Sequence, residues 1–582
     1  MIKLVKYFRK KDVLCILACL LLVIFQVWLE LRMPEYMSSI TKLVTTDGNE
    51  MKEIIKQGLL MLLCAGGSMI TAILVGFFAS KLSASFAARL REKVFKQVQS
   101  FGVAEVKKFS TASLITRTTN DVTHVEMFIS MGLQMLIKAP IMAIWAISKI
   151  IDKSIELSSL VAGGVLILLL TVLSIMIVVA PRFKLIQKYI DGINNSTREN
   201  LMGIRVIRAF NAEKFQEDRF NKVNDELLDT SLTVQKTFAL MMPMMNFVMH
   251  FLTLGIYFIG SLLIVNAGMV AKIDLFSNVV VFSSYGIQVI MSFLMLALIF
   301  MIYPRANVCS IRINEVLNED ISVVDGINSK PKEVGTVHFN NVSFKYPDAD
   351  EYLLKNISFD VKKGETVAFI GSTGSGKSTL INLIPRFYDV TDGEILVDGV
   401  DVREYKIDTL NEIISYVSQK AVIFTGTVKE NVSFGGKEIS EGRVKEAIKV
   451  AQAEDFVKKM EEGLDAHIAR GGTNVSGGQK QRLSIARAIA KNPEIYIFDD
   501  TFSALDYQTD AKLRKELKKY TKGATILIVA QRIGTIMNAD KIIVLDNGEC
   551  VGMGTHKELL KNCEVYKEIA LSQLSKEELD NA

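Results

Sequence analysis

The fold of the second half of this chain is decided by one run, Val367-Ala368-Phe369-Ile370-Gly371-Ser372-Thr373-Gly374-Ser375-Gly376-Lys377-Ser378-Thr379. Four apolar residues that fit a buried strand lead into the pattern GxxxxGK[ST], and a helix is expected from Leu380. Glycines let backbone N–H groups approach phosphates closely, and a helix start favours an anion. The run predicts a phosphate-binding loop over 371–379, in which Lys377 reaches the β- and γ-phosphates and Ser378 binds Mg²⁺.

A second apolar run, Ile495-Tyr496-Ile497-Phe498, leads into Asp499 and Asp500. A carboxylate at the end of a buried strand, across from a phosphate loop, holds Mg²⁺ directly or through water. A capping role for Asp499 is the alternative. ATP and Mg²⁺ are therefore the predicted cofactors.

Length and composition divide the chain in two. At 582 residues it is too long for one compact core, and its apolar density drops near residue 305. The net charge of +5 comes from Lys and Arg placed mostly in loops beside apolar runs, which indicates cytoplasmic membrane loops and not nucleic-acid binding. The six Cys form no CxxC pair, so neither a disulfide framework nor a metal site is expected.

Six apolar runs are long enough to cross a lipid bilayer. The basic segment before the first one is expected to precede an uncleaved spanning helix, because the apolar run is too long for a signal peptide. The long loops 81–130 and 181–239 are basic, which places them, the N-terminus and the second domain in the cytoplasm of a multi-pass cell-membrane protein. The expected spans are 13–33, 57–80, 131–151, 158–180, 240–265 and 277–303.

A few polar residues interrupt these spans. Lys138 and Gln134 are expected near a helix end, where the lysine reaches the interface, although a lone cation can also mark a substrate path. Gln288 also stands within a span, and His250 lies deeper, where it fits a place facing a cavity as well as one away from it. A run of methionines at 241, 242, 244, 245 and 249 fits either an adaptable binding surface or ordinary packing.

The sequence thus predicts a membrane all-α domain of six transmembrane helices followed by an α/β P-loop nucleotide-binding domain. The expected division is a transmembrane domain at 1–305, a connector at 306–335, an ATP-binding domain at 336–570 and a polar tail at 571–582.

A third motif identifies a family. The run Ser476-Gly477-Gly478-Gln479 stands before a helical segment, where backbone N–H groups can meet a further phosphate. Together with the phosphate loop and Asp499, this run resembles the signature of the ATP-binding cassette (ABC) transporters. Six spans and one cassette resemble a half-transporter of the exporter type.

The resemblance implies further roles. In that family the signature of one cassette closes on the ATP held by the other, so Ser476, Gly477, Gly478 and Gln479 would serve a second chain. Tyr346 matches the aromatic residue that stacks on adenine, Gln419 matches the glutamine that senses Mg²⁺, and Asp506 matches a loop at the dimer interface. The segments 109–122 and 200–210 resemble cytoplasmic coupling helices.

Two positions depart from the family pattern. Asp500 stands where the family has the glutamate that acts on the attacking water, and it is shorter by one methylene, about 1.5 Å of reach. Gln531 replaces a histidine that contacts the γ-phosphate, and an amide cannot become a cation. The signature is intact apart from Val475 in place of leucine. A glutamate that often precedes the signature is also not evident in 469–473.

These departures indicate the degenerate-site subunit of a heterodimeric multidrug-type exporter of amphipathic small molecules. A second half-transporter would then carry the competent site. A homodimeric exporter of lipid or peptide, in which Asp500 and Gln531 are tolerated variants, is the alternative. An ATP-gated channel or regulatory subunit is disfavoured because the sequence shows no added regulatory insert.

Overall fold

A computed structural model describes residues 2–45, 51–151, 154–435 and 439–574. The chain divides into two compact units. The membrane unit comprises 1–98 and 112–319. The nucleotide unit comprises 320–582 together with the short segment 99–111, which is therefore a piece of the cytoplasmic loop that packs with the second domain.

The membrane unit is helical, and each of the six predicted spans falls within a helix that is long and apolar enough to cross a membrane. Several of these helices exceed the bilayer: a helix of 49 residues is about 74 Å long, against about 30 Å of hydrocarbon. The helices are α1 (Lys10–Thr45), α2 (Met51–Gln99), α4 (Thr111–Thr118), α5 (Asn120–Met131), α6 (Ile137–Ile151), α7 (Ile155–Met202), α8 (Ile204–Ala209), α9 (Glu213–Ala239), α10 (Met241–Val265) and α11 (Met269–Leu317).

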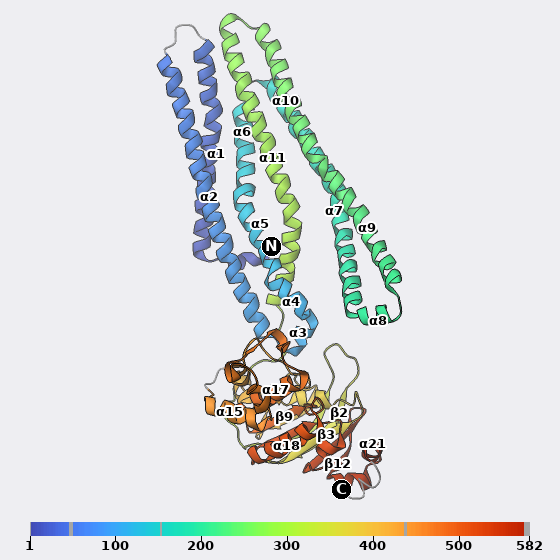
Figure 1. The fold of residues 1–582 in the computed structure, drawn as a ribbon. Helices are drawn as coiled ribbons and strands as arrows, with labels where there is room; N and C mark the ends of the chain where they lie inside the picture. The colour runs from blue at the N-terminus through green and yellow to red at the C-terminus, as the bar shows by residue number, and fades with distance from the viewer. Residues whose placement is uncertain (1, 46–50, 152–153, 436–438, 575–582) are drawn as a thin grey trace. The chain divides into compact units, whose positions relative to one another are not determined.

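Helices α7 and α9 run side by side, and the short helix α8 joins them at the end farthest from α10 (Figure 1). Close approach between helices depends on small residues: a Cβ added at Gly260 of α10 would lie 2.3 Å from Val279 Cγ2 of α11. On the other side of α11, the Tyr285 hydroxyl donates to Leu31 O of α1 at 2.9 Å. Helix α11 thus holds both neighbours.

The structure gives Lys138 a partner that the sequence did not indicate. Lys138 Nζ lies 2.8 Å from Glu30 Oε1 of α1. The span that carries it is continuous from Thr111 to Ile151, and Gln134 lies in a π-helical turn within it. Of the other residues singled out, Met241 and Met245 are buried, whereas His250 is exposed within this unit.

The nucleotide unit contains two main sheets and one small ribbon. A mixed six-stranded sheet has the order β12-β11-β3-β10-β9-β6, and an antiparallel four-stranded sheet has the order β2-β1-β4-β5. The strands are β1 (Val337–Phe344), β2 (Leu354–Val361), β3 (Thr366–Gly371), β4 (Asp392–Val397), β5 (Val400–Asp401), β6 (Ile414–Val417), β7 (Gly426–Thr427), β8 (His467–Ile468), β9 (Ile495–Asp499), β10 (Thr525–Val529), β11 (Lys541–Asp546) and β12 (Glu549–Gly554).

Successive side chains of the central strands point to opposite faces of the larger sheet, and both faces are packed with apolar residues. In β9, Ile495 and Ile497 join one hydrophobic cluster while Tyr496 and Phe498 join the other, as the period of two in a strand requires. The helices of this unit are α3 (Val103–Phe109), α12 (Lys377–Leu383), α13 (Ile407–Ile413), α14 (Val428–Val432), α15 (Glu441–Val450), α16 (Glu454–Val457), α17 (Gly477–Lys491), α18 (Tyr507–Tyr520), α19 (Ile533–Ile536), α20 (His556–Asn562) and α21 (Glu564–Gln573).

Several boundaries differ from those expected. Helix α11 continues to Leu317, within the segment assigned to a connector. The ATP-binding domain begins with strand β1, whose pairing with β2 is irregular between Phe339 and Val342. Of the polar tail, residues 575–582 lie outside the described residues.

A buried pair of acids joins three segments of the nucleotide unit. Asp398, in the turn between β4 and β5, is fully buried, and its Oδ1 accepts the Thr336 N–H at 2.8 Å. Asp398 Oδ2 and Glu494 Oε2 accept no hydrogen bond from an N–H or hydroxyl within the described ranges. Burial and the facing Glu494 carboxyl raise the pKa of Asp398 to about 7, so the two acids share a proton.

This pair should make stability depend on pH. Between the ordinary aspartate pKa of about 4 and the raised pKa of about 7, the folded chain holds one proton more than the unfolded chain. The contribution to stability is therefore full below about pH 4 and is lost as pH rises through about 7, at up to about 1.4 kcal/mol per pH unit.

The substitution Asp398→Asn should remove this dependence, because an amide can donate to Glu494 at any pH. Chemical unfolding of both full chains in detergent is followed from pH 5.5 to 8.5. As pH rises, the free energy of unfolding of the variant should increase relative to that of wild type. Parallel curves for the two chains would contradict the shared proton.

Candidate functional site

Four parallel strands that lie next to one another in the six-stranded sheet end at the predicted site. Strands β3, β10, β9 and β6 are neighbours and all point the same way. The phosphate loop follows β3, Gln531 follows β10, Asp499 and Asp500 lie at and after the end of β9, and Gln419 follows β6. The carboxyl edge of a parallel sheet is where α/β proteins bind ligands, so the fold brings these residues together.

The phosphate loop has the backbone of an anion cradle. Gly374 and Gly376 have φ of +87° and +94°, and a Cβ at Gly376 would lie 2.6 Å from Leu354 Cδ2. Lys377 Nζ lies inside the loop, donating to Gly371 O at 2.9 Å and to Ser372 O at 2.7 Å. Burial lowers the pKa of Lys377. Since these two carbonyls and a third acceptor, the Ser375 hydroxyl at 3.3 Å, are all uncharged, an anionic phosphate would be a stronger partner for the ammonium, and the loop fits the predicted nucleotide.

Two oxygen donors of the kind that Mg²⁺ prefers meet beside this loop. Ser378 Oγ donates to Asp499 Oδ1 at 2.8 Å. The second carboxylate oxygen, Asp499 Oδ2, accepts the Tyr416 hydroxyl at 3.1 Å. Burial raises the pKa of Asp499. A hydroxyl and a carboxylate in contact, next to a phosphate loop, fit a Mg²⁺ site, with Ser378 and Asp499 as its residues.

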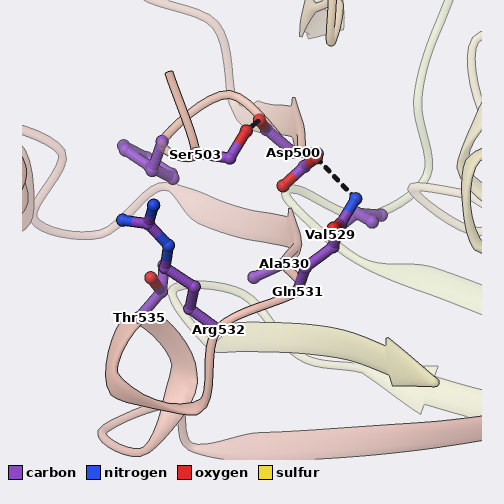
Figure 2. Close-up of a pocket in the computed structure, with 8 residues that line it drawn as sticks. Asp500, Ser503, Val529, Ala530, Gln531, Arg532 and Thr535 are labelled. Atoms are coloured by element: carbon purple, nitrogen blue, oxygen red, sulfur yellow. Dashed lines mark hydrogen bonds between the residues drawn. The ribbon is translucent and has the colours of Figure 1, made fainter. Parts of the chain in front are cut away.

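The residue after Asp499 is held by two amides. Gln531 Nε2 donates to Asp500 Oδ2 at 2.8 Å, and Gln419 Nε2 donates to the same oxygen at 3.0 Å. Figure 2 shows Asp500 and Gln531 pointing toward one another across a small pocket that Ser503, Arg532 and Thr535 also line. One of the two carboxylate oxygens of Asp500 is thus already engaged by two donors, neither of which can take up a proton.

The predicted adenine platform has an unforeseen neighbour. The Tyr346 hydroxyl bonds Thr379 Oγ1 at 2.9 Å, and its ring meets Tyr388 edge to face. Lys107 of α3 places Nζ 4.8 Å from the centre of the Tyr346 ring. Beside them lies a cavity of about 430 Å³, lined by Ala104, Phe344 and Pro347 among others. A residue from the cytoplasmic loop thus takes part in the predicted nucleotide site.

The signature residues form a separate site. Ser476 caps α17 in a capping box with Gln479, and Gly477 and Gly478 begin the helix. In the described part of the chain, no hydrogen bond or ion pair joins residues 476–479 to the phosphate loop at 371–379. Asp506 likewise caps its own helix, α18, by accepting the Thr509 N–H at 2.9 Å. The signature residues and the phosphate loop thus stand at the starts of two different helices, α17 and α12.

Sequence reasoning missed Tyr416 and Lys107. Tyr416 stands three residues before Gln419, but nothing in its spacing indicates that its hydroxyl reaches Asp499. Lys107 lies more than two hundred residues before Tyr346, and their meeting depends on α3 packing in the nucleotide unit. Of the two segments expected to be coupling helices, 109–122 contains the short helix α4 and 200–210 contains the short helix α8. Helix α3, which carries Lys107, ends where the first of these segments begins.

Comparison with known proteins finds matches to both units of the chain. Residues 16–293 match the ABC transporter transmembrane region, and residues 354–503 match the ABC transporter domain. An uncharacterized ABC transporter ATP-binding protein of Mycobacterium tuberculosis is 38% identical over 547 residues, 92% of this chain and 93% of the relative. A putative multidrug export ATP-binding/permease protein of Staphylococcus aureus is 32% identical over 496 residues, 82% of each chain.

The fold is also that of a solved structure. A bacterial Atm1-family ABC exporter with ATP bound superimposes with a TM-score of 0.81 at 22% identity, covering 97% of this chain and 99% of the other. The helical unit and the nucleotide unit are both included in that match.

The Tyr416 contact leads to a prediction about metal affinity. Burial raises the pKa of the Tyr416 hydroxyl, which therefore stays protonated and orients Asp499. The substitution Tyr416→Phe keeps the ring that packs against Phe387 but removes this donor. Loss of an outer hydrogen bond to a metal ligand costs about 10- to 100-fold in affinity. Mn²⁺ binding with ATP, followed by electron paramagnetic resonance, should weaken by at least about tenfold.

The matched control is Tyr405→Phe, which removes a buried hydroxyl that donates to Val397 O, away from the site. Both variants should bind ATP normally in excess chelator. Unchanged Mn²⁺ affinity in Tyr416→Phe, or an equal loss in the control, would show that Tyr416 does not orient Asp499.

Proposed function

The chain belongs to the ABC transporter family, and we propose that it is one half of an ATP-driven exporter in which its own ATP site is degenerate. The export function is supported by the similarity to the multidrug export protein of S. aureus and by the fold shared with an ABC exporter. Cytoplasmic ATP would drive the movement of amphipathic small molecules across the cell membrane. Bound nucleotide supplies contacts that close two cassettes, and product release reopens them.

The residues of the phosphate loop would hold the nucleotide. Lys377 would exchange its carbonyl partners for phosphate oxygens, and Tyr346 would stack on the base. Ser378 and Asp499 would hold Mg²⁺, with Gln419 near by. When bound, Mg²⁺ neutralises charge that develops on the transferred phosphoryl group.

The observation that carries the degenerate site is the pair of amides on Asp500 Oδ2. A general base needs a free carboxylate lone pair within reach of the water. Asp500 is about 1.5 Å shorter than glutamate, and displacement of that order can cost roughly 10²-fold in rate. Gln531 adds a second loss, because it cannot supply a cation at the γ-phosphate. Slow turnover at a site that still binds ATP is the expected result.

A second chain is supported by surfaces that one chain leaves uncovered. Gly477 and Gly478, at the start of α17, would present their N–H groups to nucleotide on a partner. Around α8, apolar residues are unusually exposed: Met202 by 82% and Phe210 by 78%. An apolar tip of this kind fits docking on another chain. We propose a partner half-transporter with glutamate and histidine at the positions of Asp500 and Gln531.

The alternative is a homodimeric exporter, whose two equal sites would both use Asp500 and Gln531. A second and less favoured alternative is an ATP-gated channel or regulatory subunit. Accumulation of substrate against a gradient in sealed vesicles separates an exporter from a channel, since a channel only equilibrates its solute.

The deciding experiment measures ATP turnover of the purified full chain beside its Mg-ATP binding. Wild type should bind ATP but hydrolyse it slowly, and the double substitution Asp500→Glu with Gln531→His should raise turnover by roughly 10²-fold. The double substitution combined with Lys377→Ala serves as the control and should remain inactive. Brisk hydrolysis by wild type alone would contradict the degenerate site and favour the homodimer.

A further inference from the structure

A charged cluster lies within the membrane unit, and we call it the Glu30 cluster: Gln26, Glu30, Ser68 and Lys138. Glu30 Oε1 accepts hydrogen bonds from Gln26 Nε2 at 2.9 Å, from Ser68 Oγ at 3.0 Å and from Lys138 Nζ at 2.8 Å. Three spans, those of α1, α2 and α6, supply these groups. The Lys138 and Glu30 side chains are 17% and 16% exposed, so the pair is sheltered but still reachable.

The depth of this cluster argues against a role at the membrane surface. Ser68 stands near the middle of the apolar run 57–80, and its contact with Glu30 places the carboxylate at hydrocarbon depth. Ionised groups at this depth are costly, and they mark substrate or ion pathways. A structural link between the helices would not need them, because apolar residues of similar volume stabilise as well or better.

The backbone beside Lys138 is also irregular. Residues Gly132–Leu136 form a π-helical turn that ends two residues before Lys138. Such turns are rare and occur frequently at functional sites, because the extra residue in the turn alters which face the following side chains occupy. This feature is independent of the ion pair and points to the same place.

A polar residue of α11 lies at the same level. The Tyr285 hydroxyl bonds Leu31 O, and Ser277 Oγ donates to Ser38 O at 3.2 Å, so α1 and α11 run antiparallel in this register. Gln288 is three residues beyond Tyr285 and therefore level with residue 28, between Gln26 and Glu30. Its Oε1 is buried and has no hydrogen-bond partner in the described ranges.

The unused hydrogen-bonding capacity of this layer defines a ligand. Among the described residues, Lys138 Nζ has one acceptor, so two of its three N–H donors remain free. Glu30 Oε2 and Gln288 Oε1 remain as free acceptors. The Glu30–Lys138 pair is neutral overall, so a purely cationic or purely anionic group would meet one like charge. A head group with both an N–H donor and an anionic acceptor matches all of these atoms.

We propose that Glu30, Lys138 and Gln288 bind the head group of a transported amphiphile that carries both a primary ammonium and an anionic group. The ammonium bonds Glu30 Oε2 and Gln288 Oε1, and the anionic group bonds Lys138. This assignment rests on the proposed export function, because it names the class of substrate that the membrane unit takes up.

The test is the binding of a fluorescent acyl phosphoethanolamine to the purified full chain in maltoside micelles, followed by polarisation. Three probes with the same acyl chain carry a phosphate, a trimethylammonium or a phosphocholine head group. The phosphoethanolamine should bind at least about tenfold more tightly than each of them, because each lacks one charge or the N–H donors. Equal binding of all four probes would overturn the proposal.

Single substitutions then test the named atoms. Glu30→Gln, Lys138→Met and Gln288→Leu should each weaken binding by about tenfold or more. The matched control is Lys149→Met, which breaks the neighbouring, more exposed pair with Glu35 and should leave binding unchanged. Gln288→Leu introduces no unpaired charge, so it remains informative if the charge variants fold poorly. Wild-type affinity in Gln288→Leu and Lys138→Met would overturn the site.

An exchanged pair separates recognition from a structural link. The double substitution Glu30→Lys with Lys138→Glu retains an ion pair between α1 and α6. A recognition site predicts restored thermal stability without restored binding, and restored binding would overturn it. Mg-ATP binding and ATP-dependent accumulation in vesicles are measured separately. Probe binding without accumulation would contradict the export function alone, whereas accumulation without head-group selectivity would contradict this inference alone.

Discussion

The hydrogen bond between Ser378 and Asp499 joins the two runs on which the nucleotide unit depends. It exists because β3 and β9 lie on either side of β10 in the parallel part of the six-stranded sheet, so that their carboxyl ends meet at one edge. The residues that follow these strands, namely the phosphate loop, Gln419, Asp500 and Gln531, are placed by this register. A shift of one residue in β9 would turn Asp499 to the opposite face and bury it among apolar side chains. The burial of the apolar strand residues and the position of the polar residues at the sheet edge therefore require the same register.

The edge residues differ in what holds them. Asp499 meets a hydroxyl on each oxygen, from Ser378 and from Tyr416, and these contacts orient it without adding charge. Asp500, one residue later, meets amides instead, which hold its carboxylate but cannot exchange protons with it. Two adjacent aspartates thus have different chemistry, because hydroxyls bond the first and amides bond the second. The proposed division between nucleotide binding and slow hydrolysis has this local origin.

In the membrane unit, contacts between elements form in lipid and not in water. Its helices pack through small residues such as Gly260, because lipid gives apolar side chains little reason to prefer one another. Against that background, the Glu30 cluster is the exception that needs an explanation. Three donors from separate helices bond one carboxylate oxygen of Glu30. The other oxygen of Glu30 and two of the three N–H donors of Lys138 therefore remain available to a ligand.

The sequence by itself determined the class of the protein, through six apolar runs, one phosphate loop and one signature motif. Each of these is a local pattern that can be recognised from neighbouring residues alone. It also placed Asp500 and Gln531 at positions that depart from the family, since those are identities at motif positions. Only the tertiary structure decided the partners. That Lys138 meets Glu30, that Tyr416 meets Asp499 and that Lys107 lies over Tyr346 depends on contacts between residues 83 to 239 positions apart. Such contacts follow from how helices and strands pack, and no periodicity or spacing along the chain encodes them.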